Sequence, residues 1–146
     1  MKVLKFGGTS VADSKSINKV VTILNNNDDN LLIIVSAFGG VTNLLQECIN
    51  LKGKSTEGIL KEIETRHLEV IDNLSSLDGQ SSLKSFLKEK LNELEDILDA
   101  ISTIDEVTQK IISKVLTLGE ILSSSIIYEI LKQKRFDISY LDSKEV

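Results

Sequence analysis

Glycine pairs follow two apolar runs within the first 42 residues of the chain. Gly7-Gly8 comes directly after a run that begins at Val3, and Gly39-Gly40 closely follows the apolar run 31–35. Paired glycines let backbone amides approach a ligand, and a helix that starts after them directs its positive end toward an anion. The pattern therefore predicts two strand–turn–helix units of an α/β enzyme that handles phosphate.

The segment between the glycine pairs predicts a βαβ unit. We expect a strand at 2–6, a helix from Asp13 or Ser14 to Leu24, and a strand at 31–35 that is covered on both faces. Because the crossover between such parallel strands is right-handed, both glycine turns should lie at the same carboxyl edge of the sheet. Two weak motifs thus predict one site.

The rest of the chain reads as helices followed by one more strand. Apolar spacing predicts helices near 42–52, 56–75, 81–102 and 105–133, with 78–82 as a turn before the third of them, and a third parallel strand at 136–141. Three strands are few for so many helices. We therefore expect one domain that is a piece of a larger α/β domain.

Composition excludes several classes of protein. The net charge is −5 with 17 dispersed Lys and Arg residues, which disfavours nucleic-acid binding. A hydrophobic content of 41% with 27% charged residues indicates a folded cytoplasmic protein rather than a membrane or disordered one. Cys48 alone builds neither a disulfide framework nor a cysteine-rich zinc site, and His67 lacks partners at metal spacing, so we expect no metal site and a structural His67.

Lys5 is the residue that most directly suggests chemistry. It lies in an otherwise apolar strand immediately before Gly7-Gly8, where its ammonium group must reach either solvent or an anion. We favour phosphate binding over an exposed, solvated lysine. A Walker A loop places its lysine after the glycines, and no GxGxxG motif is present, so neither of those nucleotide-binding motifs applies.

The segment 5–11, KFGGTSV, resembles the opening signature of the aspartate kinases, in the amino-acid-kinase superfamily. The similarity continues in order along the chain, through the segments 35–37, 40–45, 118–123 and 141–143, with a helical middle that matches mainly in character and in the neighbourhood of Arg66 and His67. The family has a three-layer αβα sandwich of the carbamate-kinase-like type. The resemblance implies the N-terminal portion of that fold, with a mainly parallel sheet and a large helical subregion at about 42–133.

The resemblance also implies an activity. Aspartate kinases transfer the γ-phosphoryl group of ATP to the side-chain carboxylate of L-aspartate, which gives 4-phospho-L-aspartate and opens lysine, threonine and methionine biosynthesis. ATP and Mg²⁺ are implied, although the sequence identifies no ligands for the metal. By resemblance Lys5 is the catalytic residue that neutralises the transferring phosphoryl group. The implied phosphate-binding residues are Lys5, Phe6, Gly7, Gly8, Thr9 and Ser10.

Four further residues match the family's aspartate-binding positions: Ser36, Ala37, Thr42 and Glu120. Thr42 is equally suited to cap the helix that follows, and Glu120 has the alternative of a solvated helix face. Two departures stand out. Phe38-Gly39 replaces small residues, and Asp142 is followed by Ser-Lys where Ala-Arg is common, which leaves a role for Asp142 in doubt.

Length sets the limit of the resemblance, because aspartate kinases continue well past residue 146. We expect residues 1–146 to form the N-terminal part of the catalytic domain, without the nucleotide-binding half or the ACT domains, and to be inactive alone. The full-length protein is expected to be a homo-oligomer, either monofunctional or fused to homoserine dehydrogenase. The alternatives are another acid-phosphorylating amino-acid kinase and a noncatalytic helical interaction module.

Overall fold

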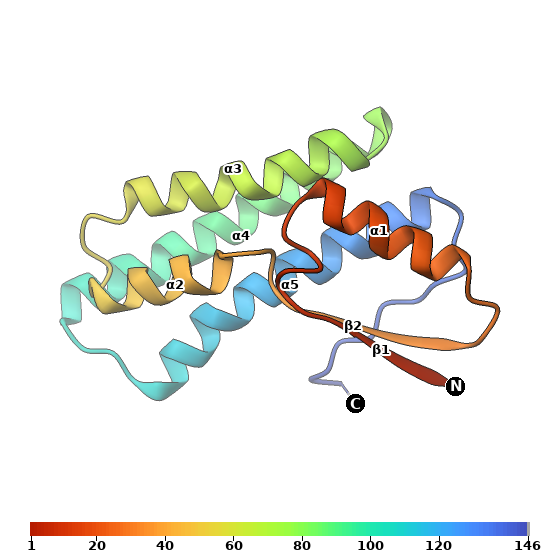
Figure 1. Ribbon diagram of the computed structural model, residues 1–146. Helices are drawn as coiled ribbons and strands as arrows, with labels where there is room; N and C mark the ends of the chain where they lie inside the picture. The colour runs from red at the N-terminus through yellow and green to blue at the C-terminus, as the bar shows by residue number, and fades with distance from the viewer. Residues whose placement is uncertain (146) are drawn as a thin grey trace.

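A computed structural model describes residues 1–145 of the chain. Figure 1 shows α3, α4 and α5 as long helices that run side by side, with a small sheet and α1 toward one end of the bundle. The elements in chain order are β1 (Lys2–Phe6), α1 (Ser14–Asn25), β2 (Leu31–Val35), α2 (Val41–Asn50), α3 (Glu57–Leu74), α4 (Leu77–Ile104) and α5 (Gln109–Gln133). The α/β class, the parallel sheet and the large helical subregion are confirmed.

Side-chain caps place the two helix boundaries that the sequence analysis misplaced. Helix α4 begins at Leu77 because the Ser76 side chain accepts a hydrogen bond from the Gly79 amide, so the predicted turn at 78–82 lies inside the helix. Helix α5 begins at Gln109 rather than 105, since Thr108 caps it and Asp105 ends α4 in the left-handed conformation.

The predicted third strand at 136–141 is wrong. The described residues form one two-stranded sheet, in which β1 and β2 pair in parallel from Lys2 with Leu31 to Phe6 with Val35. The segment after α5 is held instead by contacts with that helix. The Phe136 amide donates to the Leu131 carbonyl, and the Tyr140 hydroxyl lies 2.9 Å from Ser124 Oγ.

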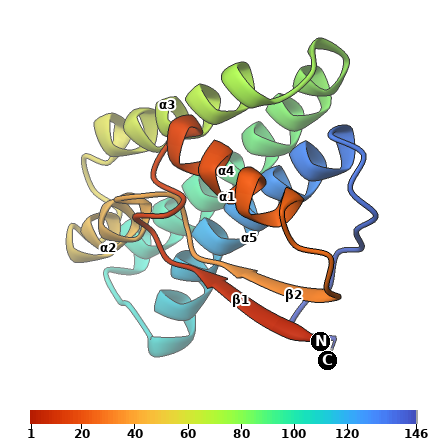
Figure 2. The same cartoon turned by 45° about the vertical axis from the view of Figure 1, so that its right-hand side comes forward.

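The helices cover only one face of the sheet (Figure 2). Side chains alternate between the two faces of a strand, and residues paired in register share a face. The residues directed at the core are Leu4, Phe6, Leu31, Ile33 and Val35, and those on the other face are Val3, Lys5, Leu32 and Ile34. Val3 is 57% exposed and Ile34 44% exposed. The expectation that β2 is covered on both faces is therefore wrong for the described residues.

Adjacent isoleucines of β2 test this division of the sheet. We expect Ile34→Thr to change the free energy of unfolding of the 146-residue chain by less than about 0.5 kcal/mol, because its side chain already contacts water. Ile33→Thr should cost about 1 to 3 kcal/mol, because its hydroxyl enters the core. Urea denaturation measures both values, and equal costs at the two positions would mean that both faces of β2 are covered.

Helix α5 is the central helix of the core, and it contacts α2, α3, α4 and β2. It is long and apolar enough to span a membrane by length and composition alone, but the core helix of a soluble protein passes the same test. Residues such as Val115, Ile126 and Ile130 are fully buried in the bundle, which accounts for part of the apolar composition of the helix. Cys48 of α2 is buried in the same core, and burial raises the pKa of its thiol to about 11.

Candidate active site

The two glycine turns contact each other at the carboxyl end of the sheet, which confirms the prediction from the βαβ unit. The Ser36 amide donates to the Phe6 carbonyl over 3.0 Å, and the Gly39 amide donates to the Val11 carbonyl over 3.3 Å. The contact requires a glycine at position 39, because a Cβ there would lie 2.9 Å from the Ala12 Cα and 3.3 Å from the Gly8 carbonyl oxygen. Parallel pairing and this close approach bring the two motifs into one place.

The first glycine turn, which contains Gly7-Gly8 and is called the first turn below, is closed by its own backbone hydrogen bonds and open on one side. The amides of Ser10 and Val11 both donate to the Gly7 carbonyl, over 2.9 and 3.2 Å. A Cβ at Gly7 would meet no atom within 4 Å. The Phe6 side chain is buried and anchors the end of β1, while Thr9 and Ser10 are exposed. A ligand therefore has access to the backbone of this turn.

Lys5 lies at the same end of β1, on the face of the sheet that the helices leave uncovered. Within residues 1–145 it takes part in no ion pair, whereas Lys2 of the same strand pairs with Asp29. Its charge is therefore available to an anion near the first turn.

The positive end of α1 is occupied by the protein's own carboxylates. Asp13 accepts a hydrogen bond from the Ser16 amide over 2.8 Å, and this bond lowers the pKa of Asp13. Glu69 of α3 accepts from the Ser14 amide over 3.1 Å and from the Ser14 hydroxyl. The expectation that this helix directs its amides at a ligand is therefore wrong, and phosphate binding stays a prediction for the turn before it.

The start of α2 carries no such cap. Gly40 is the N-cap residue in the left-handed conformation, with φ of 79° and no hydrogen bond from a side chain. Thr42 is the second residue of the helix and is exposed, so the alternative that Thr42 caps α2 is wrong. The start of α2 thus follows the second glycine turn without a side-chain cap, with the Val41 amide paired to the Phe38 carbonyl over 3.0 Å and Thr42 exposed.

Helix α5 packs directly against the second turn. The Ser123 hydroxyl donates to the Ser36 carbonyl over 2.8 Å. A Cβ at Gly119 would lie 3.0 Å from the Ala37 Cβ, so the absence of a side chain permits this approach. Glu120 follows Gly119 and is exposed, so the fourth sequence-predicted substrate residue lies on the part of α5 that packs against the second turn.

The resemblance included the neighbourhood of Arg66 and His67, but sequence reasoning did not predict the contacts that α3 makes at the site. Arg66 Nη1 donates to the Gly39 carbonyl over 2.5 Å, and Arg66 Nη2 lies 2.6 Å from Glu62 Oε1. Glu69, one helical turn further along, holds Ser14. These contacts join residues far apart in the chain, and no local pattern indicates which face of α3 meets the turns.

His67, the only histidine in the chain, packs beneath the second turn. Its side chain is fully buried, its ring centroid lies 5.0 Å from that of Phe38, and Nδ1 lies 2.7 Å from the Ile63 carbonyl oxygen. Burial lowers the pKa of His67 to about 4. The imidazole is therefore neutral at neutral pH and supports the turn by packing.

This pKa predicts that the folded chain loses stability on acidification. The unfolded chain binds a proton near the ordinary pKa of 6.5, and the folded chain only near 4. Between these values the unfolded state binds more protons, so the free energy of unfolding falls by about 2 kcal/mol from pH 7 to pH 5, and by about 3 kcal/mol in full. Urea denaturation of wild type and His67→Leu at both pH values isolates this contribution. Parallel pH dependence of the two proteins would contradict it.

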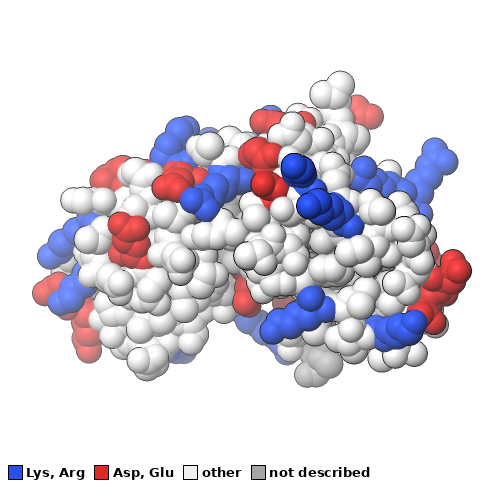
Figure 3. Space-filling view, in the orientation of Figure 1, with Lys and Arg blue, Asp and Glu red and all other residues white. Residues whose placement is uncertain are grey.

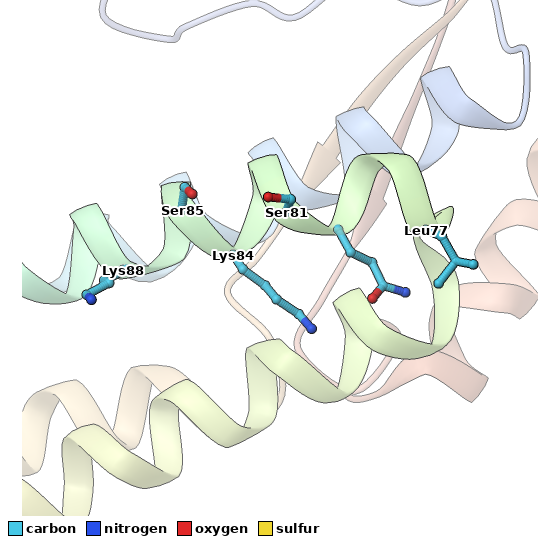
Figure 4. Close-up of a pocket in the computed structure, with 6 residues that line it drawn as sticks. Leu77, Ser81, Lys84, Ser85 and Lys88 are labelled. Carbon is cyan, nitrogen blue, oxygen red and sulfur yellow. The ribbon is translucent and has the colours of Figure 1, made fainter.

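One surface depression lies away from the two turns. It runs along α4 and is lined by Leu77, Gln80, Ser81, Lys84, Ser85 and Lys88 (Figure 4). Lys84 is already paired with Asp72 over 2.7 Å. On the face shown in Figure 3, acidic and basic side chains are intermixed and form no broad patch of one sign. Neither feature competes with the two turns as a candidate site.

The chain matches the amino acid kinase family over residues 1–146. It is 32% identical to an aspartokinase of Chlamydia pneumoniae, over 99% of this chain and 30% of that protein. It is 28% identical to a bifunctional aspartokinase/homoserine dehydrogenase of Buchnera aphidicola, over 97% of this chain and 18% of that protein. The chain therefore spans less than a third of the length of these relatives.

The fold is also similar to that of a solved structure. Escherichia coli aspartokinase III, crystallised in complex with aspartate and ADP, matches 97% of this chain with a TM-score of 0.85, and the match covers 31% of that chain. The sequence identity is 22%, so this likeness shows a shared fold. The matched part of aspartokinase III therefore has the same α/β arrangement as this chain, within a longer protein.

Proposed function

The chain belongs to the amino acid kinase family, and on that basis we propose that it is the N-terminal part of an aspartokinase. The proposed reaction transfers the γ-phosphoryl group of ATP to the side-chain carboxylate of L-aspartate. The observation that supports it best is the contact between the two glycine turns, in which the Gly39 amide donates to the Val11 carbonyl. Phosphoryl transfer depends mainly on holding donor and acceptor in line and on stabilising the moving charge.

We assign the first turn to the phosphoryl donor. The Lys5 ammonium group neutralises charge on the transferring phosphoryl group, because it is exposed at the end of β1 without an acidic partner among residues 1–145. The amides that follow it donate to phosphate oxygens, and the buried Phe6 ring fixes the strand end. The proposed phosphate-binding set is Lys5, Phe6, Gly7, Gly8, Thr9 and Ser10.

We assign the second turn and the adjoining part of α5 to the acceptor. The uncapped first turn of α2 and the Thr42 hydroxyl suit a carboxylate, and the exposed Glu120 carboxylate suits the substrate's ammonium group. Ser36 and Ala37 complete the proposed substrate set, with α5 packed against them through Ser123 and Gly119.

The rest of the nucleotide site is proposed to lie in a longer protein. Residues 1–145 contain no group of three His, Cys, Asp or Glu side chains that would hold a metal ion, so these residues do not by themselves fit Mg²⁺. ATP supplies the phosphoryl group, and this chain supplies contacts to its terminal phosphate. We further propose that the longer protein is a cytoplasmic homo-oligomer and that residues 1–146 are inactive alone.

Hydroxylamine trapping of the acyl phosphate tests this function. The assay compares the longer protein with the 146-residue chain, using ATP, Mg²⁺ and a panel of aspartate, glutamate and acetylglutamate. We expect aspartyl hydroxamate from the longer protein only. Product from another acid and none from aspartate would assign a different amino acid kinase, and product from neither protein with any acid would favour a noncatalytic module.

A further inference from the structure

One face of α3 contacts the second glycine turn and the start of α1, the helix that follows the first glycine turn. Arg66 donates to the Gly39 carbonyl of the second turn over 2.5 Å, and Glu69 accepts over 3.1 Å from the amide of Ser14, the first residue of α1. The two residues lie three positions apart on one helix, so they are neighbours on its surface. A single rigid element therefore spans the two turns.

The Arg66 guanidinium is oriented before it reaches the second turn. Nη2 lies 2.6 Å from Glu62 Oε1, one helical turn away, and Nη1 reaches the Gly39 carbonyl. A side chain at Gly40 would collide with this guanidinium, so the turn is shaped to admit it. The contact therefore holds the peptide group between Gly39 and Gly40, the N-cap residue of α2.

The Glu69 carboxylate is oriented in the same way. Asn73 Nδ2 donates to Glu69 Oε1 over 3.2 Å and to the Glu69 carbonyl over 2.7 Å. The carboxylate then accepts from both the amide and the hydroxyl of Ser14. Two oxygens with defined donors fix the direction in which the chain leaves the first turn and enters α1.

We propose that Arg66 and Glu69 form a clamp, the α3 clamp, that sets the separation and orientation of the two glycine turns. Arg66 is a positioning residue for the second turn and Glu69 for the first. The assignment of donor and acceptor to these turns rests on the proposed function, whereas the clamp itself rests on the six hydrogen bonds given above. Since Arg66 and Glu69 act on different turns, the loss of each should weaken the binding of a different substrate.

Steady-state kinetics of the longer protein test the α3 clamp. Arg66→Met should raise the KM for aspartate on the order of 10-fold and leave the KM for ATP within about twofold, because the second turn alone is released. Glu69→Ala should raise the KM for ATP by a similar factor. Glu69→Gln should restore most of this loss, since its amide oxygen still accepts from the Ser14 amide.

The control variant is Lys61→Met on the same helix. Lys61 pairs with Glu64 over 3.3 Å and is exposed, so this variant removes a comparable ion pair and should behave as wild type. Unchanged KM values in Arg66→Met and Glu69→Ala would overturn the clamp. Equal increases of both KM values in both variants would also overturn it, since they would indicate general destabilisation.

Amide hydrogen exchange gives a readout that does not depend on activity. In Arg66→Met, exchange should quicken at 38–42 and stay unchanged in α4; in Glu69→Ala it should quicken at 10–16. Absence of hydroxamate from the wild-type protein would reject the proposed function, and exchange alone would then decide the clamp. Unchanged exchange at both turns would overturn the clamp even if the wild-type enzyme phosphorylates aspartate.

Discussion

Lys5→Ala is expected to lower the kcat of phosphoryl transfer in the longer protein by about 100- to 1,000-fold. The lysine supplies a full positive charge where negative charge develops during transfer, and removal of one such stabilising group typically has an effect of this size. Because the Lys5 side chain is exposed, the free energy of unfolding should change by less than about 0.5 kcal/mol. Hydroxamate formation at saturating aspartate and ATP measures the loss.

Lys2→Ala is the matched control for this prediction. Lys2 is an exposed lysine of the same strand, but it lies at the opposite end of β1 and pairs with Asp29. We expect its kcat to equal that of wild type. Equal losses in the two variants would indicate a general effect of charge, and full activity of Lys5→Ala would remove Lys5 from the site.

Gly39→Ala is expected to destabilise the fold by about 1 to 3 kcal/mol and to abolish most activity with it. The new Cβ would lie 2.9 Å from both the Cα and the Cβ of Ala12, and because the Cα belongs to the backbone, the two turns must move apart. That movement separates donor from acceptor as well as weakening the packing. Urea denaturation and the hydroxamate assay measure the two effects separately.

The same glycine-to-alanine substitution at position 58, Gly58→Ala, is expected to have the opposite effect on stability. Gly58 lies in the first turn of α3, and a Cβ there meets no atom within 4 Å. Alanine should stabilise the protein by about 0.4 to 1 kcal/mol, because it reduces the conformational freedom of the unfolded chain. If Gly39→Ala proved as harmless as Gly58→Ala, the close contact between the turns would not exist in solution.

Apolar spacing, helix caps and glycine pairs predicted the elements whose formation depends on residues close together in the sequence. The apolar spacing and the Asp13 cap gave α1, and chain handedness placed both glycine turns at one edge of the sheet. The third strand at 136–141 failed because alternation alone does not reveal whether a neighbouring strand is available. In this chain Tyr140 instead contacts Ser124 of α5.

The candidate site was predictable in its backbone and in Lys5, but not in its supports. The Gly-Gly motifs are continuous in sequence, so a local pattern is enough to detect them. The resemblance marked the neighbourhood of Arg66, but by local pattern Arg66 and Glu69 are ordinary helix-surface charges. Their contacts follow only from the packing of α3 against the second turn and the start of α1. The same packing explains why the positive end of α1 is closed to a ligand, since Glu69 already occupies it.

A crystal structure of the longer protein with a non-hydrolysable ATP analogue and aspartate tests the central claim most directly. The account predicts the terminal phosphate within hydrogen-bond distance of the Gly7–Thr9 amides and Lys5 Nζ. It places the substrate's side-chain carboxylate between that phosphate and the start of α2, with Arg66 still on the Gly39 carbonyl. Ligands bound elsewhere, with both glycine turns empty, would contradict the claim that the two turns form one site.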